Sequence, residues 1–408
     1  MKPSKSEIKS GIEKGEKPNI ELEKNRILHE LTETTRILLN RTQVFKTAGI
    51  DNKQEEKERY LKSCEDSFRP NFRFHEYPYS REKMLDLLDQ CIEETEKIDN
   101  RTLERYGCRT LEADEMQKFF RDIFQELKLN VKLASGIEKE KIWKKYSEKI
   151  WKPVEKEEVQ RSREKLKKME QEELRENIKP EEVAEMFRNE IDRLGAEYTV
   201  EVRDVAGCHN IPQEKTVVVA RGENGDRTYS REEARMVTMH EIFHAMRAYN
   251  GFKAGEKSGF PEIIGLHTPF YDRAEEGGAV YREHRTGTSY RNKKFDYHLR
   301  MVAVGEIAET DSFREDFTSI AEKLVDLGAT RERAFELLTR NREALRHHIY
   351  LAGYHDWKKI EDKERMLVGK VNEEWAEKFW KEAEADGMIQ KPEIGSEKLF
   401  DFTFKDSQ

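Results

Sequence analysis

The spacing of apolar residues along the chain predicts a mainly helical protein with one short group of strands. Apolar side chains recur at intervals of three and four residues, the period of an amphipathic helix. This period is found in residues 20–45, 81–98, 112–129 and much of 272–385. Residues 196–205 and 215–222 are instead rich in β-branched side chains, which is typical of strands. The sequence therefore predicts an α+β fold, mainly helical, with a small antiparallel sheet.

A strongly patterned segment, residues 231–249, follows these strands. Ser230 precedes it and Glu233 stands three residues further on, which is the spacing of a capping box at the start of a helix. Asn250-Gly251 is typical of a helix C-terminus and predicts that the helix ends there. We expect the sheet to pack beside this helix, with one strand edge able to hold an extended peptide by backbone pairing.

The same pattern divides the chain coarsely. Residues 1–20 lack apolar periodicity and predict a disordered tail. Residues 154–178 are the most charged run and predict a solvated helix, which Lys179-Pro180 interrupts. We expect a helical N-terminal region over 21–195 and a second region over 196–408. No linker rich in proline or glycine separates them, so the two regions are expected to form one compact unit.

Composition excludes several classes of protein. Of 408 residues, 75 are Lys or Arg and 83 are Asp or Glu, which gives a net charge of -8, and 39% are charged. No run approaches the length of a membrane-spanning helix, about 20 apolar residues, and a pI near 5.9 argues against nucleic-acid binding. The four cysteines form no CxxC pair, and the N-terminus lacks the apolar core of a signal peptide. We therefore expect a cytoplasmic protein that binds neither membranes nor nucleic acids.

Within the predicted 231–249 helix, His240, Glu241 and His244 form an HExxH motif. Histidines four residues apart project from one face of a helix, so both imidazoles can bind the same ion. Zinc takes such ligands readily, and the glutamate beside the first histidine can act as general base on a metal-activated water. The motif therefore predicts a zinc-dependent metallopeptidase with Glu241 as the catalytic base.

A catalytic zinc site also needs a third protein ligand and an open coordination position. Residues 272–284 place Glu275 and Glu276 at the start of another helical stretch, at a separation usual for a glutamate ligand on a second helix. The residues alone leave both glutamates open. Cys208-His209 could suggest a thiol nucleophile, but that segment is predicted to be a turn between strands, and we discount it.

Several segments together resemble a known family. YTVEVRDVAG, RMVTMHEIFHAMRAYNG and AEEGGAVYRE are similar to segments of the microtubule-associated tyrosine carboxypeptidases and of bacterial proteins with a QEGLA motif, a gluzincin-like group of zinc peptidases. RPNFRFHEYPYS and IYLAG also look like family segments, so the resemblance covers most of residues 71–380. It implies a zincin-like catalytic core within 196–408. It also implies that the protein removes a C-terminal residue, which can be aromatic, from a peptide or protein.

The resemblance also narrows the choice of ligand. In this family the glutamate directly before glycine is the shared one, which implies Glu276 as the third ligand beside His240 and His244. Glu275 is the fallback, or else it orients a histidine. Two positions depart from the family pattern. The family helix usually has three residues between the glutamate and the second histidine, where this chain has two, and Gly278 replaces the usual leucine.

The sequence offers several groups that could assist the reaction. A tetrahedral intermediate needs a hydrogen-bond donor for its oxyanion, and a carboxypeptidase usually binds the substrate carboxylate with arginine. The possible donors are Tyr281, His284, Tyr290, Tyr350 and the preferred pair His347-His348. The possible carboxylate-binding residues are Arg247, Arg285, Arg342 and Arg346.

Other functional classes stay open at this stage. The chain could be a non-catalytic zinc-binding or regulatory protein on the same scaffold, or a helical interaction protein in which HEIFH is incidental. Within the enzymes, an endopeptidase or an aminopeptidase is the alternative to a carboxypeptidase. The sequence does not indicate the oligomeric state.

Overall fold

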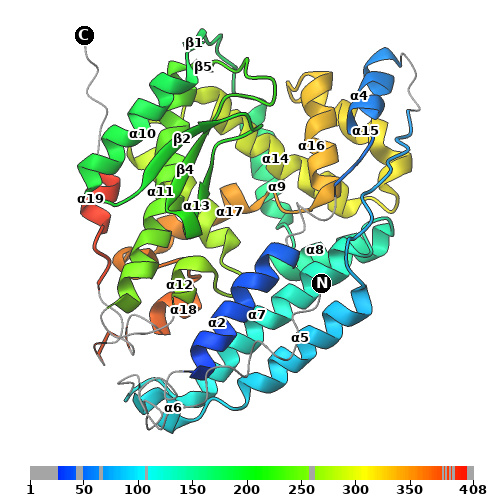
Figure 1. Ribbon diagram of the computed structural model, residues 1–408. Helices are drawn as coiled ribbons and strands as arrows, with labels where there is room; N and C mark the ends of the chain where they lie inside the picture. The colour runs from blue at the N-terminus through cyan, green and yellow to red at the C-terminus, as the bar shows by residue number, and fades with distance from the viewer. Residues whose placement is uncertain are drawn as a thin grey trace.

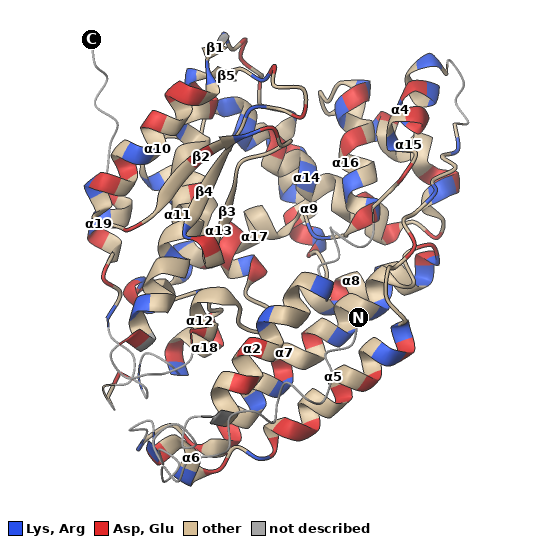
Figure 2. Ribbon diagram, in the orientation of Figure 1, with Lys and Arg blue, Asp and Glu red and all other residues tan. Residues whose placement is uncertain are grey.

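The computed structural model describes residues 26–42, 49–63, 68–105, 109–256, 262–378, 381, 384–385, 387 and 391–401. The predicted tail, residues 1–20, lies outside the described residues. The described chain is mainly helical, as predicted, and charged residues lie along most of its helices (Figures 1 and 2).

The helices before the strands are α2 (Arg26–Thr42), α4 (Lys53–Lys62), α5 (Arg81–Thr95), α6 (Asn100–Arg105), α7 (Ala113–Ala134), α8 (Glu140–Trp151), α9 (Lys156–Leu166) and α10 (Pro180–Leu194). The later ones are α11 (Arg231–Glu256), α12 (Ile263–Leu266), α13 (Asp272–Arg285), α14 (Arg291–Glu309), α15 (Phe313–Asp326), α16 (Arg331–Glu343), α17 (Ile349–Lys359), α18 (Glu373–Lys378) and α19 (Ser396–Phe400), with short 3₁₀ turns η1 (Pro212–Glu214) and η2 (Glu364–Leu367).

The strands form two small sheets. In the larger one, β4 (Thr216–Ala220) lies between β2 (Thr199–Arg203) and β3 (His209–Ile211). β2 pairs with β4 in parallel, and β3 pairs with β4 antiparallel. The prediction that the two strands seen in the sequence, β2 and β4, are antiparallel was therefore wrong. The segment between them forms β3, which runs antiparallel to β4, so that β2 and β4 can run in the same direction. The smaller sheet pairs β1 (Glu176–Ile178) with β5 (Tyr229–Ser230) antiparallel.

The helix that follows the strands, α11, does not end at Asn250-Gly251 as predicted but continues to Glu256. The Asn250 amide donates hydrogen bonds to the carbonyls of Leu367 (2.9 Å) and Ile394 (3.0 Å), both far along the chain. Gly251 lies so close to Gly265 that a Cβ atom at position 251 would be 2.5 Å from the Gly265 Cα atom. The Asn-Gly pair therefore serves packing between segments and does not terminate the helix.

Of the other predicted helix boundaries, the start of α11 is confirmed and the extent of the charged helix is not. The backbone N–H of Glu233 donates to the Ser230 hydroxyl at 3.0 Å, which confirms the predicted cap of α11. The charged run over 154–178 forms a helix only in α9, and its last residues form β1. Pro180 begins α10, since its fixed φ suits the first turn of a helix.

Two apolar cores hold these elements together, and both contain residues from either side of position 195. The first joins α2, α5, α7 and α10 to β4, α11 and the C-terminal segment, and the second joins α4, α8 and α9 to α14–α17. α17 contributes Trp357 to the first core and Leu351 to the second. It lies near the centre of the molecule (Figure 1). Among the described helices, none combines the length and the apolar character needed to cross a membrane.

Candidate metal centre

Two histidines project side by side from α11, the helix of the HExxH motif. The rings of His240 and His244 have centroids 4.8 Å apart, and each residue is only 9% exposed. Residues 242–250 of the same helix are all buried, whereas Glu241 keeps contact with solvent. The motif thus lies where a buried helix meets an accessible surface, with the glutamate on the accessible side.

Glycine packing brings α13 to this helix. A Cβ atom at Gly277 would lie 2.2 Å from the Gly353 carbonyl carbon, and one at Gly353 would lie 2.1 Å from the Arg273 oxygen. α13 and α17 therefore touch through their backbones. Gly278 faces α11, where a Cβ would meet the Phe243 ring at 2.3 Å. A larger side chain at position 278 would clash with Phe243, and this close contact sets α13 near the histidines.

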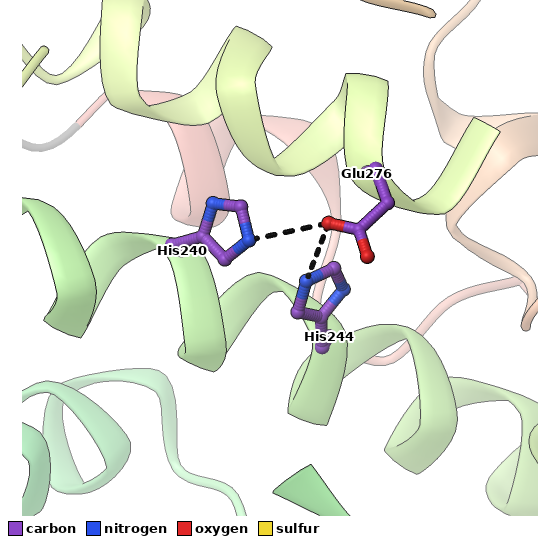
Figure 3. Close-up of side chains that lie close together, drawn as sticks. All are labelled: His240, His244 and Glu276. Carbon is purple, nitrogen blue, oxygen red and sulfur yellow. Dashed lines mark ion pairs between the residues drawn. The ribbon is translucent and has the colours of Figure 1, made fainter. Parts of the chain in front are cut away.

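Glu276 of α13 points between the two imidazoles (Figure 3). Its Oε2 atom is 3.4 Å from His240 Nε2 and 3.7 Å from His244 Nε2. One ligand atom from each of the three side chains lies within 4.8 Å of the others. Glu276 Oε2 is buried, yet it has no hydrogen-bond partner among the described residues. The structure therefore brings together the three predicted ligands, with their free atoms converging.

The outer nitrogen of each histidine is held by a second carboxylate. His240 Nδ1 lies 2.7 Å from Glu283 Oε1, and His244 Nδ1 lies 3.0 Å from Glu275 Oε1. A histidine whose Nδ1 donates to a carboxylate presents an unprotonated Nε2 for a metal. Glu275 thus takes the orienting position, one of the two alternatives predicted for it, and stands apart from the point where Glu276 meets the rings.

Glu275 is itself surrounded by cations. Arg247 Nη1 donates to its Oε2 at 2.5 Å, and Lys370 Nζ lies 3.1 Å from its Oε1. Burial favours the protonated acid, but Lys370, Arg247 and the hydrogen bond to His244 outweigh it and hold the pKa of Glu275 below its usual range. Arg247 is fully buried and also donates to the carbonyls of Met366 and Val371. In this position Arg247 supports Glu275 and is not exposed to a substrate.

Glu276 is oriented by a residue outside the motif. Arg346 Nη2 donates to Glu276 Oε1 at 3.1 Å, which leaves Oε2 to face the histidines. Burial would raise the pKa of Glu276, but the neighbouring His240, His244 and Arg346 lower it instead. Glu276 therefore remains a carboxylate. Burial raises the pKa of Glu241, although the two histidines partly oppose this rise.

The four residues predicted to bind the substrate or stabilise the oxyanion lie in different places. Besides buried Arg247, His348 is 1% exposed and lies 3.2 Å from the Trp151 carbonyl, away from the motif. His347 is also buried and stands behind Tyr350, with ring centroids 6.3 Å apart. Tyr350 stacks on His240 with centroids 6.3 Å apart. Burial and the Glu276 carboxylate raise the pKa of Tyr350 to about 12, so it keeps its proton and can donate a hydrogen bond.

The other arginines predicted to bind the substrate carboxylate also lie in different parts of the molecule. Arg285 is exposed and pairs with Asp401, and Arg342 stacks on Trp143 in a different pocket. Only Arg346 among the four lines the cavity of about 710 Å³ that adjoins the site. Other residues of its lining are Leu39, Glu126, Trp151, His209, Asn210, Ile211, His267, Tyr271, Asp272 and Lys370. The cavity follows β3, which is an edge strand.

Sequence reasoning missed Glu283, Tyr297 and Lys370. Glu283 stands seven residues after Glu276, two turns along the same face of α13, so helical spacing from the presumed ligand could have suggested it. Tyr297 donates from its hydroxyl to Glu283 Oε1 at 2.7 Å. Nothing in the sequence points to Tyr297 or Lys370, because both reach the site through tertiary packing.

The residues present fit a divalent cation. Two imidazoles and one carboxylate are donors that zinc prefers, and three protein ligands leave a position for water or substrate. Burial disfavours a charged His240, but the carboxylates of Glu276 and Glu283 outweigh it and raise the pKa of His240 to about 10. The carboxylates that favour a proton on His240 would also favour a metal ion held by these residues.

An HExxH helix with a glutamate from a second helix defines the chain as a metallopeptidase in class. The model of the MATCAP family, described as microtubule-associated tyrosine carboxypeptidase, matches residues 89–402. The chain belongs to this family, which confirms the resemblance seen in the sequence and the prediction of a metallopeptidase of the carboxypeptidase type. Comparison with curated proteins gives no significant match.

Proposed function

We propose that the chain is a zinc-dependent carboxypeptidase that removes a tyrosine or another aromatic residue from the C-terminus of a peptide or protein. His240, His244 and Glu276 hold the zinc ion in a zincin-like core, and Glu241 is the general base. The convergence of His240 Nε2, His244 Nε2 and Glu276 Oε2 carries this proposal. The orientation of both rings by Glu283 and Glu275 supports it, since only the inner nitrogens are left to bind a metal.

Each protein group then has one task in the reaction. Bound zinc supplies a Lewis acid that polarises the carbonyl of the peptide and activates water. Glu241 accepts the proton of the attacking water and passes it to the leaving amine, a role that suits a carboxyl whose pKa is raised by burial. Tyr350, protonated and stacked on His240, donates a hydrogen bond to the developing oxyanion.

The substrate can be placed by the same reasoning. An extended peptide pairs with the free edge of β3, and its side chains enter the cavity beside that strand. The aromatic residues Trp151 and Tyr271 are among those that line this cavity, whose volume of about 710 Å³ accepts a tyrosine side chain. Cys91 and Cys208 are free thiols, which agrees with a cytoplasmic location.

The test compares the wild-type protein with the Glu241→Gln variant, both loaded with zinc. A peptide that ends in tyrosine is offered with a free or an amidated C-terminus, and released tyrosine is quantified by chromatography. We expect wild type to cleave only the free peptide, and Glu241→Gln to retain zinc but lose about 10²-fold or more in kcat. Glu232→Gln, on the exposed face of the same helix, is the matched control and should behave as wild type.

The outcomes separate the alternative functions. Equal cleavage by wild type and Glu241→Gln would exclude the catalytic role of Glu241. Cleavage of the amidated peptide would indicate an endopeptidase or aminopeptidase. Stoichiometric zinc without cleavage of any peptide would favour a non-catalytic zinc-binding protein.

A further inference from the structure

Another cavity of the molecule contains none of the residues of the metal centre. Its volume is about 570 Å³, a usual size for a small-molecule pocket. It shares no lining residue with the cavity beside β3. Residues 70–74, the end of α16 and the N-terminal ends of α8 and α15 enclose it. Residues 70–74 belong to the segment RPNFRFHEYPYS, which has no part in the proposed reaction. We call this space the Arg342 cavity, after the residue of α16 that lines it.

Arg342 is buried in the wall of this cavity with part of its hydrogen-bonding capacity unused. It is 5% exposed, and its guanidinium lies 4.5 Å from the centre of the Phe74 ring and 4.7 Å from that of Trp143. Nη2 donates to the Glu138 carbonyl at 3.4 Å, whereas Nη1 has no hydrogen-bond partner among the described residues. A buried polar atom without a partner is costly unless a bound group satisfies it. Arg342 therefore indicates that a ligand enters this cavity.

The charge of Arg342 determines what kind of ligand this is. Burial lowers the pKa of Arg342 to about 10, and the charges of Glu140 and Glu138 only partly oppose this change, so the side chain stays charged at neutral pH. Glu140 is engaged elsewhere, since its carboxylate accepts from the Phe313 N–H at 2.5 Å and lies 3.7 Å from Lys144 Nζ. Within the described part of the chain, Arg342 forms no ion pair. A buried guanidinium without a counter-ion favours an anion, and it binds a carboxylate by charge-assisted hydrogen bonds.

The remainder of the wall favours a ligand with an apolar body and a single charge. Phe72, Phe74 and Phe313 all line the cavity. The ring of Phe72 has its centroid 6.4 Å from that of Phe74 and 6.5 Å from that of Phe313. Glu138 and Glu140 also line the cavity, and they would repel a second negative charge on the ligand. The lining therefore suits a monoanion better than a phosphate ester.

Backbone and side-chain hydrogen bonds hold residues 70–74 in place. Phe74 forms an antiparallel bridge with Ile50. The Asn52 amide donates to the Asn71 carbonyl at 2.9 Å, and the Asn52 side-chain oxygen accepts from the Arg73 N–H at 2.8 Å. The aromatic rings that this segment carries are thus positioned before a ligand binds, which lowers the entropic cost of binding.

We infer that the Arg342 cavity binds a small organic acid with one carboxylate on an aromatic or aliphatic body. The carboxylate accepts from the Arg342 guanidinium and supplies the missing partner of Nη1. The body of the ligand packs on the rings of Phe72, Phe74 and Phe313. This inference is independent of the proposed peptidase function, because the cavity contains none of the residues assigned to the reaction.

The test uses phenylpropionate as the probe and phenylpropionamide, which has the same shape without the charge, as its matched control. The zinc-loaded protein is labelled with fluorotryptophan, and binding is followed by fluorine NMR. Trp143 lies beside Arg342, and Trp151 lines the cavity beside β3, so their two resonances report on the two cavities separately. The variants Trp143→Phe and Trp151→Phe assign these resonances.

We expect phenylpropionate, but not the amide, to shift the Trp143 resonance. Arg342→Gln should weaken this binding by about tenfold or more, because the charge-assisted hydrogen bonds are lost. Arg340→Gln removes an exposed arginine from the same helix and should leave the binding unchanged. Acetate, which lacks the apolar body, should bind about tenfold more weakly or less tightly still.

Four results would overturn the inference. These are an equal Trp143 shift with acid and amide, an Arg342→Gln protein that binds within twofold of wild type, acetate binding as tight as that of phenylpropionate, and a shift of Trp151 alone. The last would place the probe in the cavity beside β3. Because the comparison of acid with amide needs only the wild-type protein, it decides the question even where Arg342→Gln does not fold.

Discussion

α5 and α7 on one side of the molecule, and α11 and α13 on the other, show two different ways of burying a helix. The buried face of α7 is apolar apart from Glu126, and it packs on Met84 and Leu88 of α5 within the first core. α13 instead buries Glu275, Arg282 and Glu283 together with its glycines. The pattern of apolar residues predicts the first arrangement, whereas the second depends on paired charges.

Ion pairs explain how α13 can be buried although it carries charged residues. A buried charge costs several kcal/mol unless a partner and further hydrogen bonds satisfy it. Arg282 is fully buried and forms an ion pair with Glu190, and it donates to the carbonyls of Leu399 and Met239 at 3.0 Å each. One side chain thus links α13 to α10, α11 and α19. The polar interior gives fixed positions to the residues around the metal centre, while the apolar interior gives stability alone.

The largest effect is expected where α13 and α17 touch. In Gly353→Ala the new Cβ would lie 2.1 Å from the Arg273 oxygen and 2.8 Å from the Gly277 Cα atom, both of them backbone atoms that cannot rotate away. We expect a loss of about 4 kcal/mol or more in the free energy of unfolding, measured by urea denaturation. The two helices must separate, so zinc binding through Glu276 should be lost as well. Gly207→Ala meets nothing within 4 Å and is the control. A Gly353→Ala protein with wild-type stability would refute the close contact.

The next effect concerns a buried charge of α13. Arg282→Met leaves Glu190 buried next to Arg193 alone and removes two hydrogen bonds to carbonyls. We expect the free energy of unfolding to fall by about 3–5 kcal/mol. Arg188→Met breaks the exposed pair with Glu185 on α10 and should cost less than about 0.5 kcal/mol. Similar losses in the two variants would remove the distinction between paired interior charges and surface charges.

The sequence predicts the features that depend on nearby residues, but it does not predict those that depend on packing between distant segments. The HExxH spacing and the cap at Ser230 depend on residues a few positions apart, and both are found where the pattern places them. The parallel pairing of β2 with β4 and the continuation of α11 past Gly251 depend on segments far apart in the chain. Glu283 illustrates the limit. Its place on α13 is readable from helical spacing, but its contact with His240 Nδ1 exists only once α11 and α13 have packed together.

A smaller effect is expected in the apolar half of the comparison. Leu88 of α5 is fully buried against α7, and Leu88→Ala should lower the free energy of unfolding by about 3 kcal/mol through lost burial and a residual cavity. Its neighbour Leu87 is 36% exposed, so Leu87→Ala serves as control and should cost well under 1 kcal/mol. Zinc affinity, measured by competition with a chelating dye, should not change in either variant. A reduced zinc affinity in Leu88→Ala would indicate that the two halves are coupled.

The finest distinction lies within the metal centre, between ligands and the residues that orient them. Glu283→Gln keeps an oxygen that can accept from His240 Nδ1 but removes its charge, so His240 becomes a weaker base. We expect zinc affinity to fall about 10- to 100-fold, with little change in the temperature of unfolding of the metal-free protein. Tyr297→Phe removes the other hydrogen bond to the same carboxylate oxygen and should weaken zinc by a smaller factor. Glu232→Gln on the exposed surface of α11 should leave the affinity unchanged. A Glu283→Gln protein that binds zinc within twofold of wild type would show that the buried carboxylate supports only the packing of α13. The charged interior would then contribute no more to zinc affinity than the apolar interior does.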